Sequence, residues 1–251
     1  MLQLAVDAAI PAAFGGAGGD ALIIDTEGSV LPERGAALAA ALAAHLARLA
    51  ARDPGNAKKA AAVPSQGDLL ARVRVLRAST PTALDAALAS LPALCDRYPT
   101  TKLVAIDSIA FHARAAGRGG APARARAIAA AAAALASLAR ERSIAVVVTN
   151  QVTTRVGGQG GGPGAGGNDA ASRLVPALGP AWAHAPTTRI LLHWRAGARF
   201  ASLVKSPSLP AARAEFCVTA DGVRGAPRKR DREEGAGEGG DVGRTGGGGG
   251  P

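Results

Sequence analysis

The sequence predicts an α/β fold with a mostly parallel sheet flanked by helices and with antiparallel strands near the C-terminus. Three apolar segments, 21–24, 102–108 and 143–149, carry this prediction, because they are short for helices and lack the polar alternation of half-exposed strands. Ala/Leu-rich helical segments lie between them, as parallel strands require. The later apolar segments are closely spaced without intervening helices, which favours antiparallel pairing at one edge of the parallel sheet.

The length of 251 residues suits one large domain with a sizeable core. Regular patterning stops near Gly225, so we expect a single domain over residues 1–225. Residues 226–251 are rich in glycine and charge, and they contain too little apolar surface to offset the entropy of ordering. We therefore expect a disordered tail there.

The formal net charge of +10 points to a polyanionic partner such as nucleic acid. Part of that charge is discounted, because the arginine bias is typical of a GC-rich genome. Cys95 and Cys217 have no second Cys or His at metal-ligand spacing, and they indicate reduced, buried thiols in an intracellular protein. The sequence shows no signal peptide and no uncharged apolar run long enough for a membrane span, so we expect neither secretion nor membrane insertion.

The elements follow in order from the N-terminus. A helical segment covers residues 1–10, and a glycine-containing loop leads into the first strand. That loop does not fit a dinucleotide site, because its glycines precede a strand instead of following one. The later expected elements are a helix 32–51, a polar loop 56–68, a strand 69–76, a helix from Pro81 to Arg97 capped at Ser79-Thr80, a strand 102–108, a loop 111–123, a helix ending at Arg142, a strand 143–149, a loop 152–168, and strands 189–194, 199–204 and 215–219.

Polar side chains follow the ends of the three apolar strands. Asp25 and Glu27 follow the first, Asp107 ends the second, and Gln151 follows the third. Ligands of open α/β sheets bind at the carboxyl edge of the strands. An aspartate there can hold Mg²⁺, which prefers oxygen ligands, and an amide can sense a phosphate. Ordinary solvated turn residues are the alternative, and these residues alone leave both interpretations open.

Taken in order, these segments resemble the core of the RecA-family recombinases, and within that family the eukaryotic C-type paralogue of homologous-recombination repair. The similarity extends from Leu2 to about Gly225. The segments that carry it are LQLAVDAAIPAAFGG (2–16), IDTEGS (24–29), LVAIDSIAF (103–111), VVVTNQVTT (146–154), LVPALGPAWAHAPTTRILLHW (174–194) and KSPS (205–208).

The resemblance implies a RecA-like core that uses ATP and Mg²⁺. Glu27 matches the carboxylate that activates the attacking water, Asp107 matches the Walker B aspartate that holds Mg²⁺ through water, and Gln151 matches the γ-phosphate sensor. His184 resembles a histidine near the neighbouring subunit's phosphates. The segment that covers the nucleotide across the subunit interface is matched by Lys205, Ser206 and Pro207.

The resemblance also implies two DNA-binding loops, at 111–123 and 152–172. The DNA-binding residues it indicates are Arg114, Arg118, Thr153, Thr154 and Arg155. A basic cluster in the tail is similar to a nuclear localisation signal and implies a nuclear protein, although a merely solvated charge run is the competing interpretation. The cluster consists of Arg228, Lys229, Arg230 and Arg232.

The chain departs from the family in one respect. No lysine is preceded by glycine, so the phosphate-cradling motif G-x-x-x-x-G-K-[ST] is absent, and the P-loop strand is missing with it. We therefore expect weak or no ATP binding, because Glu27 and Asp107 alone would repel a triphosphate. We also expect uncovered strand edges and apolar faces. The missing P-loop and its strand predict that the chain is truncated at its N-terminus, either through a truncated gene model or as a short isoform.

The resemblance implies an ATP-dependent DNA-binding subunit of a recombinase-paralogue complex, which acts on single-stranded or branched DNA in homologous recombination and double-strand break repair. An ATPase activity rests on that resemblance alone. The alternative is a nucleotide-independent scaffold subunit of a recombination complex. Another RecA-fold motor, such as a replicative helicase, fits less well because of the Thr-Asn-Gln and Thr-Thr-Arg segments.

Overall fold

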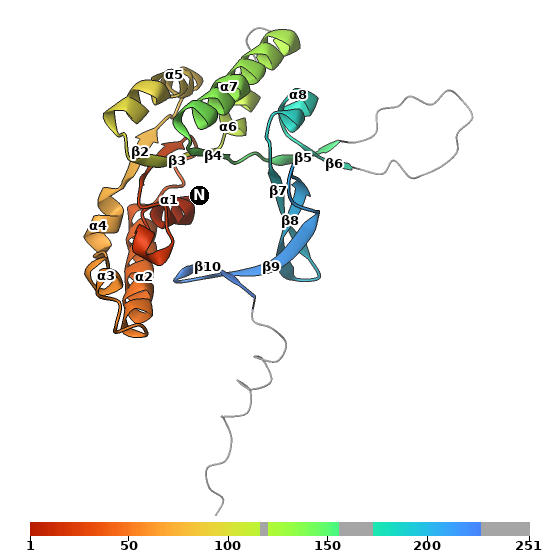
Figure 1. The fold of residues 1–251 in the computed structure, drawn as a ribbon. Helices are drawn as coiled ribbons and strands as arrows, with labels where there is room; N and C mark the ends of the chain where they lie inside the picture. The colour runs from red at the N-terminus through yellow and green to blue at the C-terminus, as the bar shows by residue number, and fades with distance from the viewer. Residues whose placement is uncertain (116–119, 156–172, 227–251) are drawn as a thin grey trace, which may run out of the picture.

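The computed structural model describes residues 1–115, 120–155 and 173–226 (Figure 1). The described strands form a parallel sheet of order β2-β1-β3-β4, an antiparallel sheet of order β10-β9-β8-β7, and the antiparallel pair β5-β6. The predicted α/β class with antiparallel C-terminal strands is confirmed. The predicted attachment at one edge of the parallel sheet is wrong, because among the described strands β4 pairs only with β3 and β7 pairs only with β8.

The parallel sheet consists of β1 (Asp20–Asp25), β2 (Val73–Arg77), β3 (Thr101–Asp107) and β4 (Ala145–Val148). All six residues of β1 are buried, because β1 lies inside the sheet and helices cover both of its faces. Asp25 lies opposite Arg77 on one side and opposite Asp107 on the other. The carboxyl ends of the strands therefore meet at one edge.

Helices cover the two faces of this sheet (Figure 1). On one face α5 (Pro81–Arg97) and α7 (Gly120–Arg142) pack against Leu22 and Ile106. On the other face α1 (Leu2–Asp7) packs against Ile23, and α2 (Pro32–Ala51) packs against α1. Each apolar side chain buried in this way stabilises the fold by roughly 1.5–3 kcal/mol.

The polar segment before β2 differs from the prediction. The expected loop 56–68 contains α3 (Ala57–Ala61) and most of the first turn of α4 (Gln66–Ala71), and β2 begins at Val73 instead of residue 69. The side chain of Ser65 accepts the amide of Asp68, whose carboxylate accepts the Ser65 amide in return. This capping box starts a helix that buries Leu69, which the period-two pattern of the segment concealed.

Both predicted DNA-binding loops contain regular structure. Residues 111–115 lie in α6 (Ala110–Ala115), residues 120–123 lie at the start of α7, and the segment 152–172 begins with β5 (Val152–Arg155). Loop interpretations of these described parts are therefore wrong, because alanine-rich sequence favours helix and β5 pairs with β6 (Arg173–Pro176). Residues 116–119 and 156–172 lie outside the described part.

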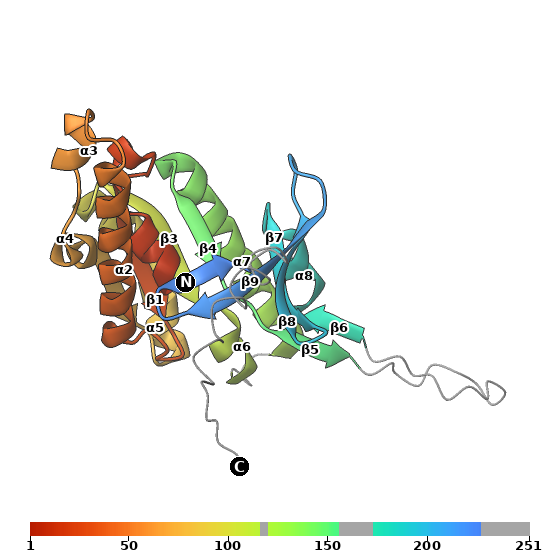
Figure 2. The ribbon, with the colours of Figure 1, turned by 90° about the horizontal axis from the view of Figure 1, so that it is seen from below.

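The antiparallel sheet contains β7 (Arg189–Arg195), β8 (Ala198–Lys205), β9 (Ala212–Thr219) and β10 (Gly222–Gly225), the last of which was not predicted. Ala196 and Gly197 join β7 to β8, both with positive φ, as tight hairpins require. Arg34 of α2 donates to the carbonyls of Thr219 and Ala220. This contact brings the β9–β10 hairpin to the N-terminal helices (Figure 2).

Two short helices complete the described structure, the 3₁₀ helix Ala12–Phe14 and α8 (Gly179–His184). Trp182 of α8 is buried in the cluster that also contains residues of β1, β3, α5 and α7. None of the helices in the described ranges has the length and apolar character needed to cross a membrane. The predicted disordered tail, 226–251, lies outside the described residues from residue 227 onward.

Candidate functional site

Three of the predicted site residues lie at the carboxyl edge of the parallel sheet. Glu27 follows β1, Asp107 ends β3 and Gln151 follows β4, and these three strands are neighbours. The side-chain amide of Gln151 donates to Glu27 Oε1 at 3.2 Å. We call the edge formed by Glu27, Asp107 and Gln151 the rim.

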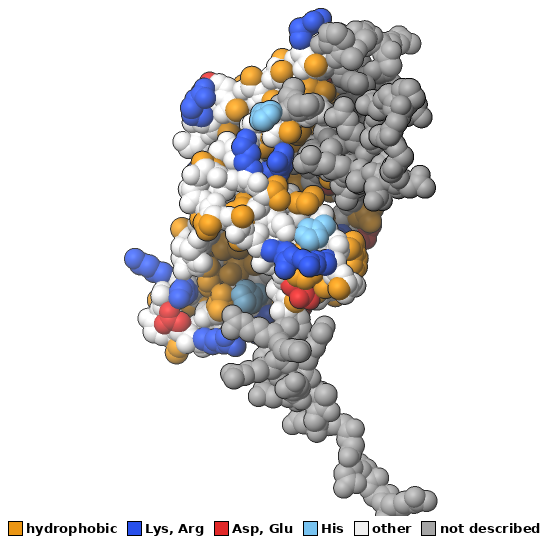
Figure 3. Space-filling view, turned by 90° about the vertical axis from the view of Figure 1, so that its right-hand side faces the viewer, with side chains coloured by type: hydrophobic (Ala, Val, Ile, Leu, Met, Phe, Trp, Pro, Cys, Tyr) orange, Lys and Arg blue, Asp and Glu red, His pale blue; other side chains and the backbone are white. Residues whose placement is uncertain are grey.

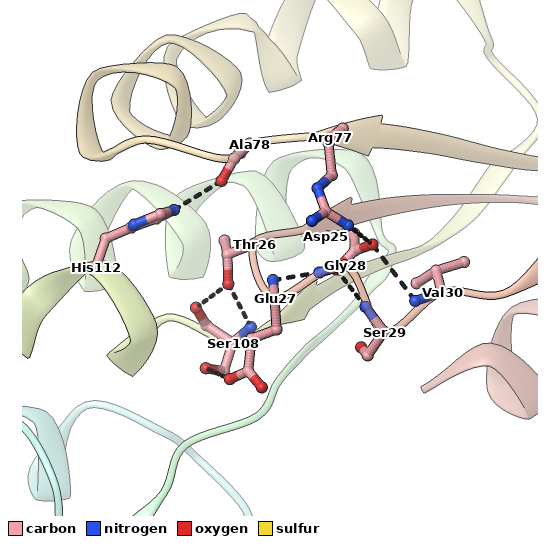
Figure 4. Close-up of polar contacts among 10 residues, drawn as sticks. All are labelled: Asp25, Thr26, Glu27, Gly28, Ser29, Val30, Arg77, Ala78, Ser108 and His112. Carbon is pink, nitrogen blue, oxygen red and sulfur yellow. Dashed lines mark hydrogen bonds and ion pairs between the residues drawn. The ribbon is translucent and has the colours of Figure 1, made fainter.

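Three hydroxyl groups hold the rim together. Ser108 Oγ donates to Glu27 Oε1 at 2.5 Å, and Thr149 Oγ1 donates to Asp107 Oδ1 at 2.6 Å. Thr26 Oγ1 accepts the amide of Ser108 at 2.8 Å and donates to its carbonyl at 2.9 Å (Figure 4). Sequence reasoning did not single out these hydroxyl residues, although each directly follows a strand.

A buried carboxylate lies beneath the turn that carries Glu27. Asp25 Oδ1 accepts the amides of Glu27, Gly28 and Ser29 at 3.2, 2.7 and 3.3 Å. Its Oδ2 accepts the amide of Val30 at 3.4 Å and pairs with Arg77 at 2.9 Å (Figure 4). The sequence placed Asp25 at a strand end, but it did not show that this carboxylate faces inward while Glu27 is exposed.

The rim supplies acidic and amide groups without a phosphate cradle. Carboxylate oxygens such as those of Asp107 suit a hard cation, and Glu27 suits the positioning of a water molecule. A triphosphate also needs amides or cations to neutralise it, but the guanidinium that lies against the Glu27 turn, that of Arg77, is paired with Asp25. The 251 residues contain no G-x-x-x-x-G-K-[ST] sequence. The chain's own residues therefore do not fit Mg-ATP without a cradle. Groups of three or more side chains able to hold a metal are not found in the described ranges.

The predicted interface residues form a second group. His184, at the end of α8, is exposed, and its carbonyl accepts a hydrogen bond from Lys205 Nζ at 2.8 Å. Ser206 Oγ accepts the amide of Leu209 at 3.1 Å, and Pro207 is exposed beside it. Within the described ranges no hydrogen bond or ion pair joins this group to the rim. The nucleotide contacts of the four interface residues therefore stay predictions.

The predicted DNA-binding residues start beside the rim. Arg114 lies in α6, which begins two residues after Ser108. Thr153, Thr154 and Arg155 lie in β5, which begins directly after Gln151. Arg118 and the cluster Arg228, Lys229, Arg230 and Arg232 lie outside the described residues.

Comparison with known proteins gives consistent matches. The sequence profile of the Rad51 family matches residues 1–226. The DNA repair protein RAD51 homolog 3 of Cricetulus griseus is 34% identical over 226 residues, which cover 90% of this chain and 58% of that protein. The protein of the same name from Dictyostelium discoideum is 31% identical over 222 residues, 88% of this chain and 55% of that protein.

An archaeal protein is similar as well. The DNA repair and recombination protein RadA of Methanocorpusculum labreanum is 33% identical over 229 residues, which cover 88% of this chain and 64% of RadA. The chain thus spans between 55% and 64% of the length of these three relatives.

Proposed function

Because the chain belongs to the Rad51 family, we propose that it acts in homologous recombination and double-strand break repair as a DNA-binding subunit of a complex with other recombinase paralogues. Its predicted kinship with the RecA-family recombinases, and with their C-type paralogue, is confirmed by these matches. The observation that carries the functional proposal is the convergence of Glu27, Asp107 and Gln151 at one edge. Single-stranded or branched DNA is the proposed ligand and the nucleus the proposed location.

The rim supports this proposal by its connections. Glu27 Oε1 accepts hydrogen bonds from Ser108, which precedes α6, and from Gln151, which precedes β5. One carboxylate oxygen therefore contacts a residue shortly before each of the two proposed DNA-binding segments. A movement of the Glu27 side chain would therefore be transmitted to both segments through these two hydrogen bonds.

ATP use is the finer part of the proposal. We assign Glu27 the water-activating position, Asp107 the magnesium position and Gln151 the phosphate-sensing position, because these residues match the family's in order. Without the phosphate cradle, we expect this chain on its own to bind ATP weakly or not at all. ATP-dependence therefore requires a phosphate cradle that these 251 residues do not supply.

DNA binding can be tested by fluorescence anisotropy with single-stranded and branched DNA. Replacing Arg114, Arg118 and Arg155 by glutamine should weaken binding by at least about tenfold and flatten the salt dependence by roughly two units of log-log slope. The matched control replaces three other arginines with the same change in charge, namely Arg48 of α2, Arg52 directly after α2, and Arg140 of α7. Equal losses in both triple variants would mean that net charge alone binds DNA, and unchanged affinity in the first would remove the assignment.

A nucleotide-independent scaffold subunit is the second candidate, and the missing cradle favours it. Titration of the chain with a fluorescent ATP analogue and Mg²⁺ should give no saturable binding at millimolar nucleotide. Assembly with paralogue subunits should then be equally tight with and without nucleotide. Saturable binding that Asp107→Asn abolishes would reject the scaffold function.

A further inference from the structure

The Asp25 carboxylate is surrounded by donors although it lies inside the protein. Its side chain is 3% exposed, and its two oxygens accept four consecutive main-chain amides, from Glu27 to Val30, together with the Arg77 guanidinium. Burying a carboxylate is costly unless such donors replace water. The turn after β1 is therefore wrapped around one charged group.

The wrapped turn sets the direction of the Glu27 side chain. The amide of Glu27 points to Asp25, while its carboxylate reaches Ser108 on the other side (Figure 4). The same carboxylate oxygen also accepts the side-chain amide of Gln151. Gly28 closes the turn with φ +74°, and a Cβ at this position would lie 2.1 Å from the Arg77 guanidinium. The backbone of the turn therefore has little room for another conformation.

We propose that Asp25, paired with Arg77, is the positioning residue that holds the Glu27 carboxylate between Ser108 and Gln151. Asp25 acts through the backbone of the turn, because the only atom of Glu27 it contacts by a hydrogen bond in the described structure is the amide nitrogen. The inference rests on the proposed role of Glu27 for its functional meaning. Its geometry can be tested without nucleotide or DNA.

The other end of β1 offers a matched control. Asp20 is also buried, with a side chain that is 9% exposed, and it pairs with Arg74 of β2 at 2.7 Å and with Arg72 at 3.5 Å. The strand, the partner strand and the carboxylate–guanidinium chemistry are the same at both ends. Only Asp25 carries the turn that contains Glu27.

The experiment compares Asp25→Asn with Asp20→Asn in the full 251-residue chain by ¹⁵N NMR. Asparagine keeps one acceptor oxygen but adds an NH₂ group, which cannot accept the turn amides. In Asp25→Asn, exchange of the Gly28 and Ser29 amides should accelerate by at least about tenfold, as loss of a charge-assisted hydrogen bond implies. The Gln151 side-chain amide should also shift, because it contacts Glu27. Asp20→Asn should lower global stability and leave the Gln151 side-chain resonance in place.

A second pair of variants covers the case in which Asp25→Asn does not fold. Arg77 is 54% exposed, so Arg77→Gln removes the charge without opening a cavity. Its effect on the Gly28 amide should be smaller, roughly threefold, because Asp25 keeps its four amides. Arg74→Gln is the control at the other end and should leave that amide unchanged.

The outcomes separate this inference from the proposed function. A Gln151 side-chain resonance that moves in the Asp25 and Arg77 variants alone supports the positioning role, even where DNA binding by the chain fails. The same resonance and the same exchange rates in the Asp25 and Asp20 variants would overturn it, while DNA binding could still be demonstrated. The two proposals therefore fail independently.

Discussion

The two large sheets of this chain use similar apolar residues in opposite ways. In β1, Leu22, Ile23 and Ile24 are each 0% exposed, whereas in β7 Ile190 and Leu192 are 59% and 65% exposed. Helices cover both faces of the parallel sheet. Hydrophobic side chains remain exposed between basic ones on the side of the molecule that carries the antiparallel sheet (Figure 3).

The difference teaches that a strand's composition does not fix its burial. By alternation, Ile190, Leu192 and Trp194 share one face of β7, and Arg199 of β8 stacks on the Trp194 ring at 4.3 Å. The parallel sheet and the helices that cover it, which we call the parallel half, therefore contribute most of the buried apolar area. The antiparallel half is the sheet β7–β10. It is held to the parallel half in part by the contacts of the β9–β10 hairpin with α1 and α2.

The largest expected effect comes from a matched pair of leucines. Leu22→Ala should lower the free energy of unfolding by about 3 kcal/mol, because it leaves a cavity between the sheet and the covering helices α5 and α7. Leu192→Ala should lower it by less than about 1 kcal/mol, because most of the side chain is already in water. Urea denaturation measures both values. Equal losses would mean that the face containing Leu192 is covered in solution.

The two cysteines report on the same contrast. Cys95 of α5 is buried in the core cluster as predicted, and burial raises the pKa of its thiol. The predicted burial of Cys217 is wrong, because this residue of β9 is partly exposed. A thiol reagent at pH 8 should therefore modify Cys217 first and Cys95 on the order of a hundredfold more slowly, since Cys95 reacts only after local opening. Cys217→Ser should remove the fast phase. A fast phase that survives this substitution would show that α5 opens readily.

The parallel half shows what a sequence can reveal. Strand positions in 21–24 and 102–108, helix bounds at residues 32–51 and 81–97, and the gathering of polar groups at one edge all follow from local pattern and from the geometry of parallel sheets. These features depend on residues that are close together in the sequence, so local patterns predict them. The confirmed α/β class rests on the same patterns.

The rest depends on contacts between distant segments. The donors that bind Asp25 include Arg77, and Ser108 reaches Glu27 across 81 positions, so neither contact has a local signal. The separation of the antiparallel sheet could not be predicted either, because apolar alternation indicates a strand but not its neighbour. The α4 capping box did have a signal, Ser65-x-x-Asp68, which the alternating pattern of the following residues obscured.

A smaller effect is expected at the junction of the two halves. Arg34→Met removes two hydrogen bonds from α2 to the β9–β10 turn, which should lower stability by about 1 kcal/mol, because the contact is partly exposed. Amide exchange should accelerate in residues 219–223 and stay unchanged in β1. Arg48→Met, on the same helix, is the control. Faster exchange in both sheets would show that the halves unfold as one unit.

The smallest expected effect concerns pH and the capping box of α4. Hydrogen bonds from the Ser65 side chain and backbone hold the pKa of Asp68 below its ordinary value of 3.8. Because the folded carboxyl binds its proton more weakly than the unfolded one, this contribution is present above pH 3.8 and is lost as the pH falls through the folded pKa. Amide exchange in residues 65–71, corrected for its intrinsic pH dependence, should therefore accelerate on acidification, while Asp68→Asn should show the fast exchange already at neutral pH. Equal acid sensitivity of the wild type and Asp68→Asn would place the titrating group elsewhere in the parallel half.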